Sequence, residues 1–117
     1  MTTLRDGDAS WSFPHEVAAS LGLAVGDAAT IVVRPERMEL VEHHEGDRLS
    51  PGANVLAGTV AETVYLGVAR KVVVDLDRGG TVHVRVERER GVTESTHGTR
   101  VLVGWEPAAG VVVRGRP

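Results

Sequence analysis

The sequence contains no cysteine, a single lysine and only four aromatic residues among its 117 positions. The absence of cysteine excludes disulfides, thiol catalysis and cysteine-based zinc sites. So few aromatic side chains leave little of the stacking surface that binds single-stranded nucleic acids, and the net charge of −3 also disfavours a nucleic-acid partner. No apolar stretch approaches the roughly 20 residues of a membrane-spanning helix.

Two motifs with a defined role are also missing. The phosphate-binding loop of ATPases, Gly-x-x-x-x-Gly-Lys-Ser/Thr, wraps backbone amides around the phosphates and contacts them through its lysine. The only lysine, Lys71, lies in no such motif, so this chain does not hydrolyse ATP by itself. The first residues, MTTLRDGDASW, are polar and lack the apolar core of a signal sequence, which predicts a soluble cytoplasmic protein.

Valine and glycine are abundant instead. Twenty-one valines and 14 glycines form short apolar runs divided by turn residues, a pattern typical of an all-β small barrel or sandwich. In 81–88, Val82, Val84 and Val86 alternate with polar residues, so one face of this strand is expected to be buried. Segment 69–77 has the same alternation, and the glycines in 77–80 predict a hairpin turn between the two strands.

The remaining elements are predicted from turn residues. Strands are expected within 10–14, 54–67, 96–107 and 110–114, and 42–54 is expected to be a polar loop. Gly58 predicts a bulge or sharp bend in the long strand, and Gly67 the start of the turn after it. The one predicted helix is 14–23, because Pro14 favours the first helical position and Gly22 the end.

An order of glycine, strand, proline and second short strand occurs twice. Gly26 lies nine residues before Pro35, Gly98 lies nine residues before Pro107, and each pair brackets an apolar run. Proline cannot donate to a strand ladder and restricts φ, so it ends one strand and redirects the chain toward the next. Both prolines are therefore predicted to form corners.

Few side chains suggest catalysis or metal binding. Arg34 and Glu36 flank Pro35, and they either pair at the rim of the barrel or contact another subunit. His43 and His44 have acidic neighbours, which is compatible with a metal site or with a solvated loop. The loop is favoured, because adjacent histidines in an extended segment point to different sides. We predict no catalytic residue, no metal and no cofactor.

Three segments in order resemble a known family. VRPE closes a strand after VGDAATI, NVLAGTVAETVYLG follows a variable loop, and GTRVLVGWEP lies near the end. Together, over residues 25–113, they resemble the TOBE domain of ABC-importer ATP-binding subunits of the polyamine (spermidine/putrescine) or ferric-iron type. The resemblance implies an OB-like small β-barrel, and here one short helix is expected near the N-terminus. It also implies a non-catalytic regulatory domain that lies beneath the ATPase core and contacts its counterpart in the ATPase dimer.

The candidate binding residues are positions that match these motifs: Asn54, Arg34, Glu36 and Tyr65. Most of them are expected to be structural. Related small TOBE domains bind oxyanions such as molybdate between subunits, through a strand that starts with Ser/Ala-Arg-Asn. Here Gly52-Ala53-Asn54 lacks the arginine. A free-standing oxyanion-binding protein, with Asn54 and nearby backbone amides as its site, is the alternative function.

The chain departs from the family because it has no ATPase core. The strand that usually precedes the segment beginning MTTLRDGD is also missing, as expected for a domain excised from a longer ATPase or encoded separately. An unpaired edge favours pairing with a second copy, so residues 1–117 are predicted to form one domain that assembles as a homodimer. The other expected partners are the ATPase core and the membrane permease, at the inner face of the cell membrane, without insertion into it.

Overall fold

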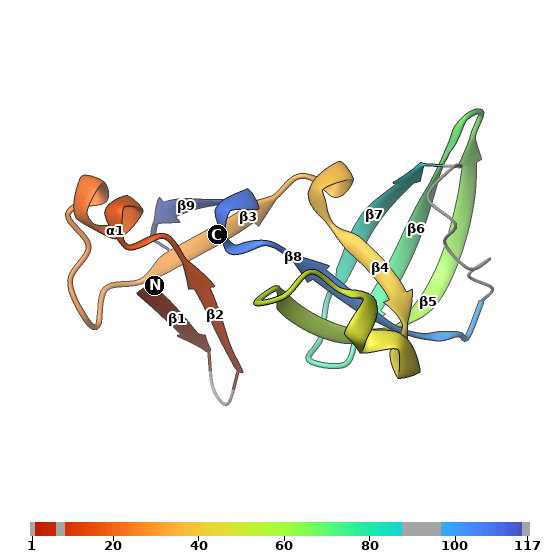
Figure 1. Cartoon of the computed structure of the whole chain (residues 1–117), viewed down its shortest axis with the longest axis horizontal. Helices are drawn as coiled ribbons and strands as arrows, with labels where there is room; N and C mark the ends of the chain where they lie inside the picture. The colour runs from red at the N-terminus through yellow and green to blue at the C-terminus, as the bar shows by residue number, and fades with distance from the viewer. Residues whose placement is uncertain (1, 7–8, 88–96, 116–117) are drawn as a thin grey trace.

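The computed structural model describes residues 2–6, 9–87 and 97–115, which form two lobes along a long axis of 42 Å (Figure 1). The small lobe contains the hairpin of β1 (Thr2–Asp6) and β2 (Ala9–Phe13), the helix α1 (His15–Leu21), and β3 (Ala29–Val33) paired with β9 (Gly110–Arg114). The barrel lobe is an antiparallel sheet in the order β4-β8-β5-β6-β7, made of β4 (Glu39–Glu42), β5 (Asn54–Leu66), β6 (Ala69–Leu76), β7 (Thr81–Glu87) and β8 (Arg100–Trp105). Short 3-10 helices connect them: η1 (Pro35–Arg37), η2 (His43–Arg48) and η3 (Pro107–Ala109).

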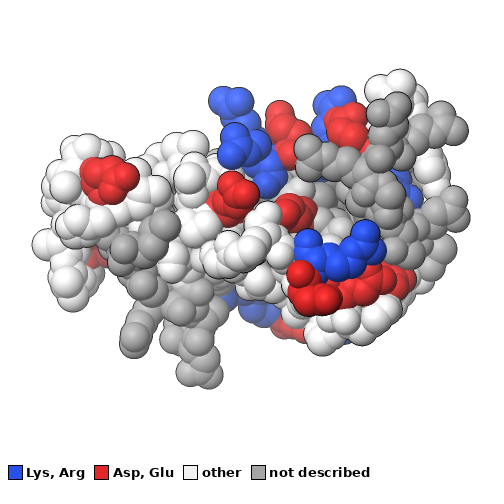
Figure 2. All heavy atoms as spheres, in the orientation of Figure 1, with Lys and Arg blue, Asp and Glu red and all other residues white. Residues whose placement is uncertain are grey.

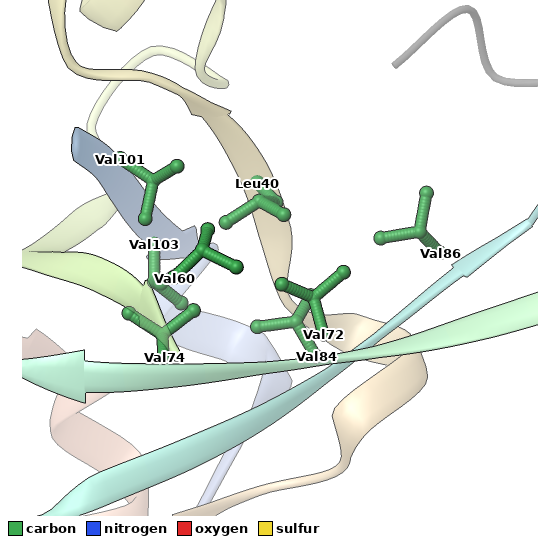
Figure 3. Packing of buried hydrophobic residues seen from close by; sticks show 8 residues of the cluster. All are labelled: Leu40, Val60, Val72, Val74, Val84, Val86, Val101 and Val103. Carbon is green, nitrogen blue, oxygen red and sulfur yellow. The ribbon is translucent and has the colours of Figure 1, made fainter. Parts of the chain in front are cut away.

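Valine side chains fill the centre of the barrel lobe. Val72 and Val74 of β6 and Val84 of β7 are completely buried, and they meet the inward residues of the other three strands (Figure 3). The sheet curls until its two outer strands, β4 and β7, approach each other, which gives a partly closed barrel. The predicted all-β class, with one α-helix near the N-terminus of the described chain, is confirmed.

The small lobe has a core of its own. Phe13, Ala18 and Val112 are buried there, with partly buried apolar residues of α1 and β3 packed around them. Pro14 precedes α1 as its N-cap, one position earlier than predicted, and Gly22 ends the helix with a positive φ of 68°. Glycine adopts this left-handed conformation without the steric cost of a Cβ atom.

The two glycine–strand–proline units form one long antiparallel ribbon. β3 pairs with β9 and β4 pairs with β8, so the strand before each proline pairs with the strand after the other. Arg34 and Glu106, which precede the prolines, have the same backbone angles (φ −66°, ψ 141°), and Pro35 and Pro107 each begin a 3-10 helix. The second unit follows the first by 72 residues, as the numbers of its two prolines show. The predicted corners are therefore confirmed, and an approximate internal twofold relates them.

Most predicted strands and turns are present at the expected positions. Both strands of the β6–β7 hairpin bury the predicted valines, and its turn contains two positive-φ glycines. Strand β1 was not predicted, because TTLRD shows no apolar alternation. The expected polar loop over 42–54 contains η2, after which Leu49 is buried against the barrel.

The bulge in β5 lies three residues beyond Gly58. The register with β6 shifts between Val60 and Glu62, which leaves Ala61 as the extra residue. Gly58 has a different role, because a Cβ atom at this position would lie 2.5 Å from the carbonyl oxygen of Asp75. Glycine thus lets β5 and β6 approach closely where the barrel bends.

Gly58→Ala is expected to destabilise the fold by about 1–3 kcal/mol, because the backbone of β6 must move to admit the methyl group. Urea denaturation would measure the change in the free energy of unfolding. Gly46→Ala is the matched control, since its Cβ would meet only the flexible end of Leu102. Equal effects of the two substitutions would contradict the close approach of β5 and β6.

Candidate functional site

The structure does not bring the four predicted binding residues together. Asn54 begins β5 and is 7% exposed, whereas Tyr65 lies near the other end of the same strand and is 74% exposed. The two residues are eleven positions apart and lie near opposite ends of this strand. Arg34 and Glu36 are both exposed at the first proline corner. These positions therefore belong to at least three different surfaces or contacts.

Asn54 connects the two lobes. Its Oδ1 accepts a hydrogen bond of 2.7 Å from the backbone N–H of Ser12, and its Nδ2 donates one of 2.9 Å to the Ser12 carbonyl oxygen. The amide thus pairs with β2 as a neighbouring strand would. Both polar ends of this buried side chain have a protein partner, so the role that the structure gives it is to fasten β2 to the barrel lobe.

Aromatic residues lie at the same junction. The guanidinium carbon of Arg78, in the β6–β7 turn, lies 4.5 Å from the centre of the Trp11 ring, within the range of a cation–π contact. Trp105, opposite Asn54 in the β5–β8 ladder, is buried. Its Nε1 has no hydrogen-bond partner among the described residues. The junction is therefore built from one amide clamp and two tryptophans.

The proline corner presents Arg34 and Glu36 to solvent. The Arg34 carbonyl oxygen accepts the hydrogen bond from the Arg37 N–H that closes η1, and no described ion pair joins Arg34 to Glu36. Both charged groups thus remain available to a neighbouring molecule.

Tyr65 belongs to an exposed apolar tip. The turn from β5 to β6 is Gly67-Val68, with a positive φ at Gly67, which matches the predicted start of the turn. Leu66 and Val68 are 52% and 71% exposed, so three large side chains project from one hairpin end. Tyr65, one of the candidate binding residues, is therefore exposed and does not belong to the core.

A pocket of about 200 Å³ lies where the edges of β4 and β7 approach each other. Four glutamates, two arginines and four apolar residues line it: Glu36, Glu39, Glu45, Glu87, Arg48, Arg85, Met38, Leu40, Val41 and Val86. Its charge is therefore negative overall. The residues come from two distant segments, 36–48 and 85–87, which is why no sequence motif indicated the pocket. Glu36 is the one predicted site residue in its wall.

Acidic and histidine side chains gather beside this pocket at η2. Ligand atoms of Glu42, His44 and Glu45 all lie within 4.8 Å of one another. Arg48 donates a 2.6 Å hydrogen bond to Glu45, and this contact lowers the pKa of the Glu45 carboxyl from its usual value. Arg48 thus offsets part of the negative charge of this cluster. Basic and acidic side chains lie side by side over the barrel lobe on the face shown in Figure 2.

A second ion pair lies at the turn of the β6–β7 hairpin. Arg100 of β8 donates to both carboxylate oxygens of Asp77, with an Nη2–Oδ2 distance of 2.7 Å, and also to the hydroxyl of Thr59. The hydrogen bonds from Arg100 lower the pKa of Asp77 from its usual value. This pair connects β8, β5 and the turn on the outside of the barrel.

Comparison with known proteins identifies a family. The sequence model of the TOBE domain matches residues 31–113. A "Spermidine/putrescine import ATP-binding protein" of Rubrobacter xylanophilus is 30% identical over 93 residues, which are 80% of this chain and 22% of that protein. The chain thus spans about a fifth of that relative. The cytoplasmic molybdate-binding protein ModG, solved with molybdate bound, superposes with a TM-score of 0.73 at 24% identity, over 92% of this chain and 76% of that one. This second likeness shows the fold.

In the part of the chain that the structure describes, no helix has the length and apolar character that a bilayer crossing requires.

Asn54→Ala is expected to lower the free energy of unfolding by about 1–3 kcal/mol, because it leaves the Ser12 N–H and carbonyl without partners at the junction. Urea denaturation would measure the loss, and hydrogen exchange at the Ser12 amide would locate it. Ser12→Ala is the control, since both hydrogen bonds of the clamp use the backbone of Ser12 and are retained. An unchanged exchange rate at Ser12 in Asn54→Ala would show that the clamp is absent.

Arg100→Gln is expected to raise the pKa of Asp77 toward the ordinary aspartate value, since the guanidinium group no longer stabilises the carboxylate. A lowered folded-state pKa contributes stability above the unfolded pKa, and this contribution is lost as the pH falls through the folded pKa. NMR titration of the Asp77 carboxyl carbon would measure the shift. Arg85→Gln removes a different surface ion pair, with Glu87, and should leave Asp77 unchanged.

Proposed function

Because the chain belongs to the TOBE domain family, we propose that it is a non-catalytic regulatory domain of the ATP-binding subunit of an ABC importer. The observation that carries the proposal is the 30% identity to a spermidine/putrescine import ATP-binding protein across 80% of this chain. The importer is accordingly of the polyamine type. The partners are the ATPase core, the membrane permease and a second copy of this domain, and the location is the cytoplasmic face of the cell membrane.

The domain acts in this proposal by packing rather than by chemistry. Contacts with partner proteins need exposed side chains on a rigid support. Two exposed sites of this kind lie in segments that match the family motifs. Arg34 and Glu36 project from a corner restricted by proline, and Tyr65 projects from a two-residue hairpin turn. The lobes that carry them are fastened by the clamp between Asn54 and Ser12. Movement of one contact would therefore reach the other through the sheet.

The alternative is a free-standing oxyanion-binding protein. Its best candidate ligand residue was Asn54, whose amide is occupied by Ser12. The likeness to ModG extends over 92% of this chain, but at 24% identity it carries the fold alone. The accessory role is therefore the better supported of the two.

The test uses the ATPase core of a polyamine importer that lacks its own C-terminal region. Adding the 117-residue chain is expected to give a stable complex, seen by titration calorimetry, and a changed rate of ATP hydrolysis. Tyr65→Ala should weaken the complex about tenfold, as expected for an aromatic contact residue. Val55→Ala is the matched control, because Val55 is also exposed but lies at the opposite end of β5 from Tyr65.

Melting temperatures measured with molybdate, tungstate, sulfate, phosphate and polyamines distinguish the regulatory role from the oxyanion-binding alternative. A ligand that binds only the folded state raises the melting temperature with its concentration. The accessory role predicts no shift with the oxyanions. If the chain fails to bind the ATPase core and molybdate raises its melting temperature, the oxyanion-binding function becomes the better supported of the two.

A further inference from the structure

The outer face of the β3–β9 ribbon is a compact apolar surface that the described residues leave exposed. Ile31 and Val112 point into the core of the small lobe, so their neighbours point outward. Val32 lies opposite Val111, and Thr30 lies opposite Val113, which forms a block of four β-branched side chains. The three valines are 52%, 57% and 44% exposed in the order Val32, Val111 and Val113. This block is called the valine face below.

The internal twofold shows what happens to the equivalent face in the barrel lobe. A shift of 72 residues relates Thr30 and Val32 to Leu102 and Gly104, and relates Glu39 and Val41 to Val111 and Val113. The equivalent face is covered by the segment that follows β4.

That cover makes close contacts. A Cβ atom at Gly104 would lie 3.0 Å from Cδ2 of Leu49, and one at Gly46 would lie 3.0 Å from Cδ1 of Leu102. Ser50 also donates from its hydroxyl to Glu39 at 2.7 Å. The outer face of the ribbon is thus covered in the barrel lobe, whereas the equivalent face in the small lobe is exposed.

We propose that the valine face is the contact through which two copies of this chain associate. This inference rests on the proposed function, in which a second copy is a partner, and it names the surface used. In a twofold dimer a patch meets itself, so a patch of one charge sign would repel its copy. The valine face contains no charged side chain, although the chain as a whole has a net charge of −3.

Charges at the two ends of β3 fit the same arrangement. Asp27 precedes the strand and Arg34 follows it, and both side chains are exposed. When two ribbons pack face to face about a twofold axis that runs across the strands near Thr30 and Val113, the strands of the two copies run in opposite directions. Arg34 of one copy then lies toward Asp27 of the other, so the rim charges are complementary. This gives Arg34 a role outside its own chain, one of the two alternatives left open by its sequence.

Other exposed apolar residues fit a self-contact less well. Tyr65, Leu66 and Val68 project from a narrow hairpin tip, whereas sheet faces pack against each other as flat layers. The hairpin tip therefore serves as the comparison surface in the experiment.

Single-cysteine cross-linking is the sharpest test, because the natural sequence contains no cysteine. Val113→Cys is expected to form a disulfide-linked dimer of twice 12.4 kDa under mild oxidation. Val68→Cys, which is more exposed, is expected to stay monomeric. Dimer formation by Val68→Cys and not by Val113→Cys would overturn the proposal while leaving a homodimer intact.

Sedimentation velocity on the chain without introduced cysteines measures the association itself. Val111→Lys is expected to weaken it at least tenfold, because a dimer would bury two lysine charges against each other. Val68→Lys is the matched control and should not change it. Arg34→Glu should weaken it about two- to fivefold, as expected for a rim ion pair.

A chain that stays monomeric at all concentrations, with no cross-link at Val113→Cys, would overturn the proposed contact. Binding to the ATPase core in the separate calorimetric titration would then still support the regulatory role. Circular dichroism of each variant checks that it folds, and Val111 is exposed enough that lysine is compatible with the single chain.

Discussion

Pairing between two segments that are far apart in the chain holds the two lobes together. The backbone passes from β3 through the corner at Pro35 into β4, and from β8 through the corner at Pro107 into β9. Antiparallel hydrogen bonds join the two passages on both sides of the corners. Each proline directs its segment out of one sheet and into the next, so a single ribbon supplies two strands to the barrel lobe and two to the small lobe. The barrel sheet continues from β8 of this ribbon through β5 to β6 and β7.

The clamp between Asn54 and Ser12 makes this arrangement specific. A ribbon with two corners leaves the relative angle of its halves open to bending, and the small lobe has only a modest core around Phe13 and Val112. Two hydrogen bonds from a buried amide, together with the contact of Arg78 on Trp11, fasten β2 to the barrel lobe. Exposed features of both lobes are thereby held in fixed relation, which a domain that works through contacts requires.

Local patterns in the sequence predicted most of the fold. Valine alternation gave the inner face of β6 and β7, and the two prolines gave the corners, because both effects act between near neighbours. The pairing of β3 with β9 was not predictable, since nothing in either segment selects a partner 80 residues away. Gly58 was predicted to mark a bulge or a sharp bend; the extra residue of the bulge is Ala61, whereas glycine is required at position 58 by the close approach of β6.

The candidate site residues likewise depend on long-range contacts that the sequence does not predict. Asn54 was a candidate ligand residue because of its type and its motif, but the partner of its amide lies 42 residues earlier in the chain. Tyr65 was a candidate binding residue because it matches a family motif, and only the three-dimensional structure reveals that it is exposed at a hairpin tip. Motif matches thus select candidate positions, whereas burial and partners indicate what each position can do.

The central claim is that this domain works within an importer. Immunoaffinity purification from detergent-solubilised membranes of the native host, with an antibody to this domain, tests it most directly. Mass spectrometry of the purified material is predicted to find an ATP-binding subunit and a permease of one importer, whether the domain is fused to the ATPase or bound to it. Recovery of the domain only from the soluble fraction, free of both subunits, would contradict the account.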